Sequence, residues 1–159
     1  MPDAAETAPS PPSGATPGTF EEPLRAYLFK VELQGVTEGH FTECSGLNVQ
    51  VEPIRYREGG SGQIVHVLPG PVNYGDVTLR YGLTSSGELW QWLLSAVGGK
   101  VERRNVSILM LDSEGSQEVV RWNLTGAWPS RWRGAPLDAL NREVAIESLS
   151  LVFETLERA

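Results

Sequence analysis

The sequence predicts a mainly β fold, namely an antiparallel β-sandwich or small barrel with one flanking α-helix. Apolar and polar residues alternate with a period of two in several short segments, whereas only one segment has the spacing of an amphipathic helix. Turn-forming residues are frequent, with 17 Gly and 11 Pro among 159 residues. A chain of this length suits one domain with a single hydrophobic core.

Residues 1–22 differ in composition from the rest of the chain. Pro, Ala, Ser, Thr and Gly dominate there, and no Lys, Arg or large aliphatic residue follows Met1 up to Thr19. Such a segment buries too little apolar surface to offset the entropy lost on ordering. We therefore predict a flexible tail over residues 1–22 and one folded domain over residues 23–159.

The first half of the domain is expected to form strands. Residues 27–34 alternate, with Val31 and Leu33 on the apolar face, and residues 47–52 alternate again. Pro53 requires an edge position or a bulge there, because proline donates no ladder hydrogen bond. The chain then turns at residues 59–62 and returns over residues 63–68, which predicts a hairpin with a glycine-rich tip. We expect Pro69-Gly70-Pro71 to end the hairpin before a strand at residues 77–81.

One segment is typical of a helix that lies on a sheet. Ser85 and Glu88 form a Ser-x-x-Glu capping box, and Gly98-Gly99 stops the pattern. Between them, one helical face is apolar and carries Leu89, Trp90, Leu93, Leu94 and Val97.

The second half of the domain again predicts strands. Residues 106–111 and 118–124 flank a polar turn and indicate a hairpin, and a short extended piece follows at residues 127–133. The last strand, residues 143–156, changes the parity of its apolar residues. Either a bulge near Glu147-Ser148 shifts the pleat, or the strand passes from one sheet to another.

Charge and cysteine content exclude several classes of function. The formal net charge is −7, which disfavours direct nucleic-acid binding because no basic footprint is present. Cys44 is the only cysteine, so an intrachain disulfide and a cysteine-rich zinc site are excluded. No apolar run is long enough to cross a bilayer and no secretory signal is evident, so we expect a protein made in the cytoplasm without membrane insertion.

An enzyme is not expected. The candidates for nucleophilic chemistry are His40, Cys44 and His66, and Gly39 and Gly46 place the first two in a loop-like stretch. No nucleophile elbow, zinc-protease helix or phosphate loop occurs. No catalytic residue, metal site or cofactor is therefore predicted.

Five tryptophans are informative in a chain of this size. We expect Trp90 and Trp122 to pack in the core, where an indole buries much area. Trp128 precedes Pro129 and lies close to Arg131, so core packing and an anchor at a subunit interface are both open for it.

Several segments, taken in order, resemble phage tail tube proteins and the related inner-tube proteins of contractile injection systems. The similarity runs from about Pro23 to the C-terminus. Its marks are the opening strand Pro23–Glu32, the F-x-E-x-S-G-L segment Phe41–Leu47, the Y-R-E-G-G tip Tyr56–Gly60, Val101–Arg104, Asn123–Pro129 with its A-W-P, and Asn141–Glu147. The chain departs from the pattern in its long Pro-rich extension and in the segment Leu68–Tyr74.

The resemblance implies a tail-tube or Hcp-like fold and a structural role. Family members form six-fold rings in which each subunit adds strands to a shared barrel, and the rings stack into a tube inside a sheath. Expected partners are further copies of the chain, the sheath protein, and baseplate and tube-terminating proteins. Effector cargo or DNA would pass the channel without sequence-specific binding, and the net negative charge suits such a conduit. The subunit would end as part of a phage or phage tail-like particle.

We hypothesise that the hairpin pairs with a neighbouring subunit and that its tip reaches the next ring. Charges at the tip would then set register. The hypothesised interface residues are Arg55, Tyr56, Arg57, Glu58, Gly59, Gly60, Trp128, Arg131 and Glu143. Two alternatives stay open: a tube-initiating or sheath-tube adaptor ring at the baseplate, and a monomeric β-sandwich binding module.

Overall fold

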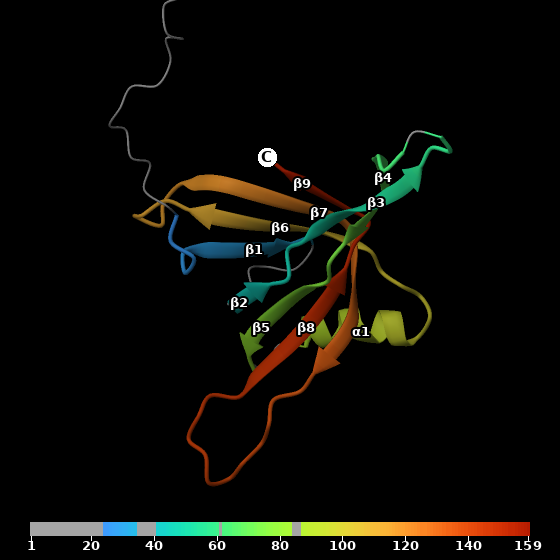
Figure 1. The fold of residues 1–159 in the computed structure, drawn as a ribbon. Coiled ribbons are helices and arrows are strands. Elements are labelled where there is room, and N and C mark those ends of the chain that lie inside the picture. Colours follow the sequence, from blue (N-terminus) through green and yellow to red (C-terminus); the bar gives the residue numbers. More distant parts are fainter. Residues whose placement is uncertain (1–23, 35–40, 61, 84–86) are drawn as a thin grey trace, which may run out of the picture.

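The structure is a computed structural model that describes residues 24–34, 41–60, 62–83 and 87–159 (Figure 1). The predicted tail, residues 1–22, lies outside the described residues. Within these ranges the chain forms nine strands and one helix: β1 (Phe29–Leu33), β2 (Phe41–Ser45), β3 (Val49–Arg57), β4 (Val65–Tyr74), β5 (Val77–Gly82), α1 (Glu88–Val97), β6 (Arg104–Leu111), β7 (Glu118–Arg133), β8 (Ile146–Val152) and β9 (Thr155–Arg158). The predicted mainly β class with one helix is confirmed.

The strands form one seven-stranded sheet and one separate hairpin. The sheet has the order β1-β6-β7-β8-β5-β2, with β9 paired to β7, and the hairpin consists of β3 and β4. All the pairs are antiparallel. The described strands do not close into a barrel, so the sandwich arrangement holds and the barrel alternative does not.

Strand β7 divides the large sheet into two parts that share one core. Its first half pairs with β6 and β9, and its second half, from Trp128, pairs with β8. Gly126 lies between the halves with φ +67, and the register with β6 shifts at this point. Only glycine adopts such a φ cheaply, so this bulge lets the strand bend. We call the two parts the β6 sheet (β1, β6, first half of β7, β9) and the β5 sheet (β2, β5, β8, second half of β7).

The C-terminal segment makes the same change of sheet. Strand β8 pairs with β5 and with the second half of β7, whereas β9 pairs with the first half of β7. The predicted passage between sheets is confirmed. It takes place at Phe153-Glu154, where the Glu154 N–H donates to the Thr125 carbonyl at 2.9 Å. The alternative, a bulge near Glu147-Ser148, does not hold, because the register of β8 with β5 is unbroken there.

The core lies between the two sheets and under α1. Alternation sends every second side chain inward, and the apolar face predicted around Val31 and Leu33 is buried. The other contributors are Val77 and Leu79 from β5, Trp92 and Leu93 from α1, Val106 and Ile108 from β6, Leu124 and Ala127 from β7, and Leu149 and Leu151 from β8.

Helix α1 forms where predicted but turns a different face to the core. Trp92 and Leu93 are its buried residues, whereas Trp90, Leu94 and Val97 are exposed. The predicted face was therefore right for Leu93 and for Leu89, which packs against the core, and wrong for the other three, because the stripe that packs also includes Trp92. The helix begins after Gly87 without a side-chain cap, so Glu88 is its first residue and not the third residue of a capping box. Ser85 lies outside the described residues. The predicted stop holds: Gly98 and Gly99 donate their N–H groups to carbonyls of the last turn.

The hairpin is longer than predicted. β4 continues through Pro69-Gly70-Pro71, which the sequence suggested as a breaker. The prolines are tolerated because β4 pairs only with β3 and because the register shifts between Val51 and Pro53, which confirms the bulge expected at Pro53. Gly70 permits that bulge, since a Cβ there would lie 2.6 Å from the Glu52 carbonyl oxygen.

The stretch around Cys44, predicted as loop-like, is instead strand β2. It pairs with β5 from Phe41 to Ser45, with a shift in register between Phe41 and Glu43. This shift disrupts the period-two pattern, which explains why alternation did not indicate a strand. The piece predicted at residues 127–133 is likewise not separate, because it continues β7 across the bend.

Candidate functional site

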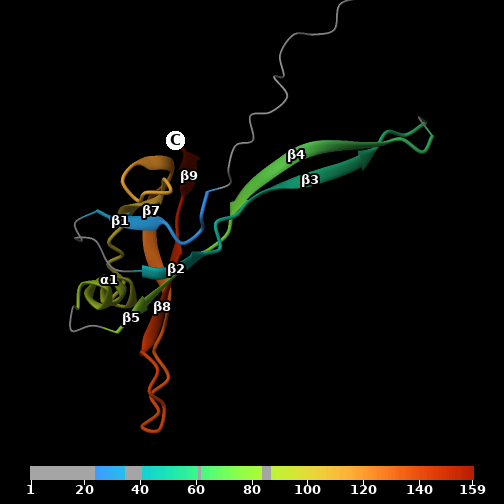
Figure 2. The same cartoon turned by 90° about the vertical axis from the view of Figure 1, so that its left-hand side faces the viewer.

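The β3-β4 hairpin, called the arm below, exposes apolar side chains that the fold of one subunit leaves uncovered. It projects from the body, and every residue of β3 is exposed (Figure 2). Its apolar side chains include Val49, Val51, Ile54, Val67 and Val72, each between 47% and 57% exposed. A lone two-stranded hairpin is marginal in water, and a contiguous apolar surface marks an interaction site. The arm therefore has the composition of a segment that a partner covers.

Both faces of the arm are apolar. Directly opposed residues share a face, so Ile54, Leu68, Tyr56 and His66 form one side. Arg55 and Arg57 lie on the other side, opposite Val67 and Val65. In addition, each of the two strands keeps one backbone edge without a strand partner among the described residues. An arm with two apolar faces and two open edges fits between partners better than against a single one.

The tip of the arm combines an aromatic pair with charges. The Tyr56 and His66 rings stack with centroids 5.3 Å apart, and His66 Nε2 lies 3.9 Å from a Glu58 carboxylate oxygen. Gly59 and Gly60 form the turn, where Gly60 has φ +95. These groups are exposed, apart from the half-buried His66, so their contribution to the stability of the lone subunit is small. Their position at the end of the arm suits them to set the register of a contact.

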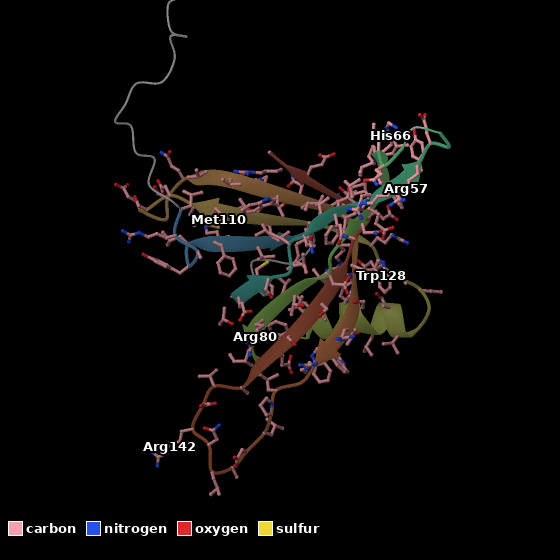
Figure 3. The ribbon with its side chains drawn as sticks, viewed as in Figure 1. Arg57, His66, Arg80, Met110, Trp128 and Arg142 are labelled. Carbon is pink, nitrogen blue, oxygen red and sulfur yellow. The ribbon has the colours of Figure 1, made fainter. Side chains whose placement is uncertain are left out.

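The structure separates the predicted interface residues into three places. Arg55 to Gly60 lie at the end of the arm, whereas Glu143 lies in the β7-β8 loop at the opposite end of the molecule, beside the labelled Arg142 (Figure 3). Glu143 bonds within that loop, to Asn141. Trp128 is half-buried and Arg131 exposed, both on the part of β7 that pairs only with β8. The nine residues thus do not form one site.

Sequence reasoning missed two exposed apolar surfaces. On α1, Trp90 is 44% exposed and meets the Trp132 ring edge to face at 5.0 Å, and Leu94 and Val97 extend this surface along the helix. In the β7-β8 loop, Leu137 and Leu140 are 84% and 94% exposed. The helical spacing did reveal the α1 residues, but spacing alone cannot tell a core face from an exterior one.

Of the groups considered for catalysis, the two that the structure describes, Cys44 and His66, lie on different elements and form no common site. His40 lies outside the described residues. Cys44 is partly buried in β2, where burial first and the nearby Glu43 second raise the pKa of its thiol to about 11. His66 is on the projecting arm. A thiol with a raised pKa is a poor nucleophile.

The described residues contain no group of three or more His, Cys, Asp or Glu side chains suited to a metal ion. Trp122 packs partly buried against the core, as predicted, with the Arg158 guanidinium 6.0 Å from its ring centroid. None of the helices that the structure describes has the length and apolarity needed to span a bilayer.

Comparison with known protein families shows to which family the chain belongs. The chain matches the family model of the T4-like virus tail tube protein gp19 over residues 25–157. The chain belongs to this tail tube family. It is a structural subunit of a tube, and the resemblance inferred from its motifs is confirmed.

Solved structures of tail tube relatives agree with this membership. The chain is 26% identical to a subunit of the PVC sheath-tube complex of an extracellular contractile injection system, with a TM-score of 0.79 over 87% of this chain and 93% of the other. For the PVC sheath/tube terminator the values are 26%, 0.80, 87% and 98%. Hcp1 from Flavobacterium johnsoniae shares the fold at 16% identity and a TM-score of 0.54, over 83% and 94% of the two chains. No curated protein sequence matches the chain significantly.

Proposed function

We propose that this tail tube protein forms hexameric rings that stack into the inner tube of a contractile injection system or phage tail. The observation that carries the proposal is the β3-β4 arm, whose two apolar faces and open edges are unsatisfied in one copy. A head-to-tail contact whose rotation closes produces a ring, and an arm that reaches a neighbour supplies such a contact. Arg55 to Gly60 meet the neighbour, Trp128 and Arg131 belong to the sheet edge, and Glu143 belongs to the opposite end.

The subunit works as a passive wall. It turns over no substrate and binds no cofactor, and sheath contraction supplies the mechanical work. Effector cargo or DNA passes through the channel without sequence-specific recognition. The relatives come from a sheath-tube complex, a sheath/tube terminator and the baseplate of the anti-feeding prophage, which supports a sheath protein, a terminator and a baseplate as partners. Assembly takes place in the cytoplasm, and the tube leaves as part of the particle.

A specialised ring is the second candidate. The terminator matches this chain as well as the sheath-tube subunit does, with TM-scores of 0.80 and 0.79. The fold therefore does not separate a repeating tube subunit from an initiator, adaptor or terminator that forms one ring.

Negative-stain electron microscopy of the purified chain separates these functions. Long tubes support the repeating subunit, and single rings that never elongate support the specialised ring. A chain that remains monomeric at high concentration would contradict both and favour the binding module.

The arm predicts the effect of one charge reversal. Arg57→Glu should leave the subunit folded, because Arg57 is exposed and outside the core, yet it should shorten or abolish tubes by placing a like charge where register is set. The matched control is Lys30→Glu, an exposed position on β1 in the β6 sheet. Tubes of normal length from Arg57→Glu in micrographs, with the control also normal, would refute the role of the tip.

A further inference from the structure

One face of the β5 sheet has no layer over it in the described structure. Leu79 and Leu149 point to the core and are fully buried. The residues that alternate with these along each strand point to the opposite face. The strand register aligns them in two rows across the sheet, which are Ser45, Thr78, Ser150 and Arg131 in one and Glu43, Arg80, Ser148 and Arg133 in the other. The Thr78 and Ser150 hydroxyls lie 3.1 Å apart, which shows that opposed residues do share this face. We call it the hydroxyl-arginine face.

The hydroxyl-arginine face differs in composition from the arm and from the exposed side of α1. Its two rows contain only hydroxyl and charged side chains, and half-buried apolar residues lie at the ends of its strands, namely Ile146 at one end and Val152 with its register partner Trp128 at the other. The arm and α1, by contrast, expose large apolar groups. A surface of small hydroxyls keeps its water and offers little that adheres to a passing chain.

The position of the core decides which face turns inward in a ring. The β6 sheet and α1 cover one side of the β5 sheet, and their bulk would block a bore on that side. The arm also continues β2 and β5, because β3 follows β2 and β4 precedes β5. The β5 sheet is thus the layer that the arm links to neighbours.

The charge of this face is opposite to that of the chain. The two rows contain three arginines, Arg80, Arg131 and Arg133, and one acid, Glu43. The arginines still outnumber the acids if Asp76, just before β5, is added. Arg80 pairs with Glu43 at 3.2 Å, whereas Arg131 and Arg133 make no ion pair within the part of the chain that the structure describes. The whole chain carries −7. The face therefore attracts acidic groups weakly.

We propose that the hydroxyl-arginine face lines the channel and that it accommodates an acidic polypeptide in transit. This inference rests on the proposed ring and tube. A polypeptide fits better than a nucleic acid because the two rows lack aromatic side chains on which successive bases would stack. Trp128 lies beside Val152 at one end of the face and offers a single stacking position, not a series.

Thiol labelling of assembled tubes tests the orientation of the face. Ser148→Cys places a thiol in the middle of it, and Ser113→Cys is the matched control in the exposed β6-β7 turn. In tubes, N-ethylmaleimide should label both positions. A maleimide carried on a folded protein should label Ser113→Cys at least tenfold faster, and the difference should vanish in dissociated subunits. Equal labelling of both by the large reagent in intact tubes would overturn the inference while leaving the tube function standing, whereas absence of tubes would overturn both.

Retention of labelled polymers tests the passenger. Tubes are assembled with fluorescent poly-glutamate, poly-lysine or single-stranded DNA of equal charge and then pelleted. Poly-glutamate should be retained severalfold over poly-lysine at low salt, with the difference lost at high salt. Arg131→Glu/Arg133→Glu should reverse the preference, and Ser148→Glu provides the same test on a strand away from the sheet edge. Equal retention of the two polypeptides, or retention of DNA in preference to poly-glutamate, would overturn the acidic polypeptide.

Discussion

Gly46 shows how a single residue positions the arm. It joins β2 to β3 with φ +91, and a Cβ there would lie 2.1 Å from the Asp76 carbonyl oxygen. Gly46→Ala should therefore destabilise the subunit by roughly 2 kcal/mol or more, because strain and a backbone clash add. Denaturant unfolding measures the loss. Gly59→Ala, with ordinary φ and nothing within 4 Å of its Cβ, is the control and should stay near wild type.

The environment of Cys44 predicts slow labelling. Its thiol pKa is raised from 9.0 to about 11, so the folded protein at pH 8 holds about a hundredfold less thiolate than the unfolded chain. N-ethylmaleimide should react correspondingly slowly with the native protein and rapidly in guanidinium. The thiol introduced by Ser113→Cys should react at an ordinary rate, and a native Cys44 that reacts equally fast would contradict the prediction.

The same shift predicts a loss of stability at alkaline pH. Below pH 9 both states keep the thiol protonated, so the contribution of Cys44 is fully present there. Between about pH 9 and 11 only the unfolded chain ionises, and stability therefore falls as pH rises through this window. Unfolding curves of wild type and Cys44→Ala should converge across it.

The location of single residues could be predicted from the sequence only where it depends on the spacing of neighbouring residues. Arg57 and Gly59 were correctly assigned to a hairpin tip, because Gly-rich turns between alternating segments have a local cause. The burial of Trp92 was not predicted. Which of two adjacent stripes of a helix faces the core depends on the sheet against which the helix packs.

At the scale of the element, α1 separates core from surface within three residues. Trp92 is 1% exposed, and its indole N–H donates to the Glu102 carbonyl at 2.7 Å, whereas Trp90 lies at the surface. Trp92→Ala should cost about 3–5 kcal/mol through the cavity it leaves. Trp90→Ala should cost about 1 kcal/mol or less. Thermal unfolding of the two variants checks the contrast, and similar losses would contradict the assignment of faces.

Element prediction failed where tertiary pairing overrode local signals. Pro69-Gly70-Pro71 has the composition of a breaker, yet β4 passes through it, because a strand with one partner and a bulge tolerates missing N–H groups. Strand β2 was not predicted, because the shift in its register with β5 disrupts the alternation of apolar and polar residues. In contrast, the segments that became β1, β5 and the β6-β7 hairpin have regular patterns, and these were predicted closely.

For the whole molecule, the sequence indicated two sheets through the parity change in its last strand, but not where they exchange. That point depends on Gly126 and on the contact of Glu154 with Thr125, which are long-range features. The two candidate surfaces also differ in whether the sequence predicted them. The arm was foreseen from its motif, whereas the hydroxyl-arginine face needed the register of four strands before its residues could be placed together.

The arm should be separable from the fold of the subunit. None of the described residues between 49 and 72 belongs to the core or packs against it. Gln50 and Asn73 oppose each other in register, so replacing residues 51–72 by Asn-Gly closes a two-residue hairpin at that point. The shortened subunit should lose less than about 1 kcal/mol, which corresponds to a fall in Tm of roughly 2–4 °C at most.

The shortened subunit should not assemble at all, because it lacks the apolar faces and the unpaired backbone edges of the arm. Analytical ultracentrifugation should show a monomer at every concentration, while the full chain forms rings or tubes under the same conditions. Replacing only Gly59-Gly60 by Asn-Gly is the control for a changed turn with both strands kept, and it should still assemble. Tubes formed without the arm would show that the sheet edges of β1, β2 or β9 suffice to join subunits, and the arm would then lose its central role.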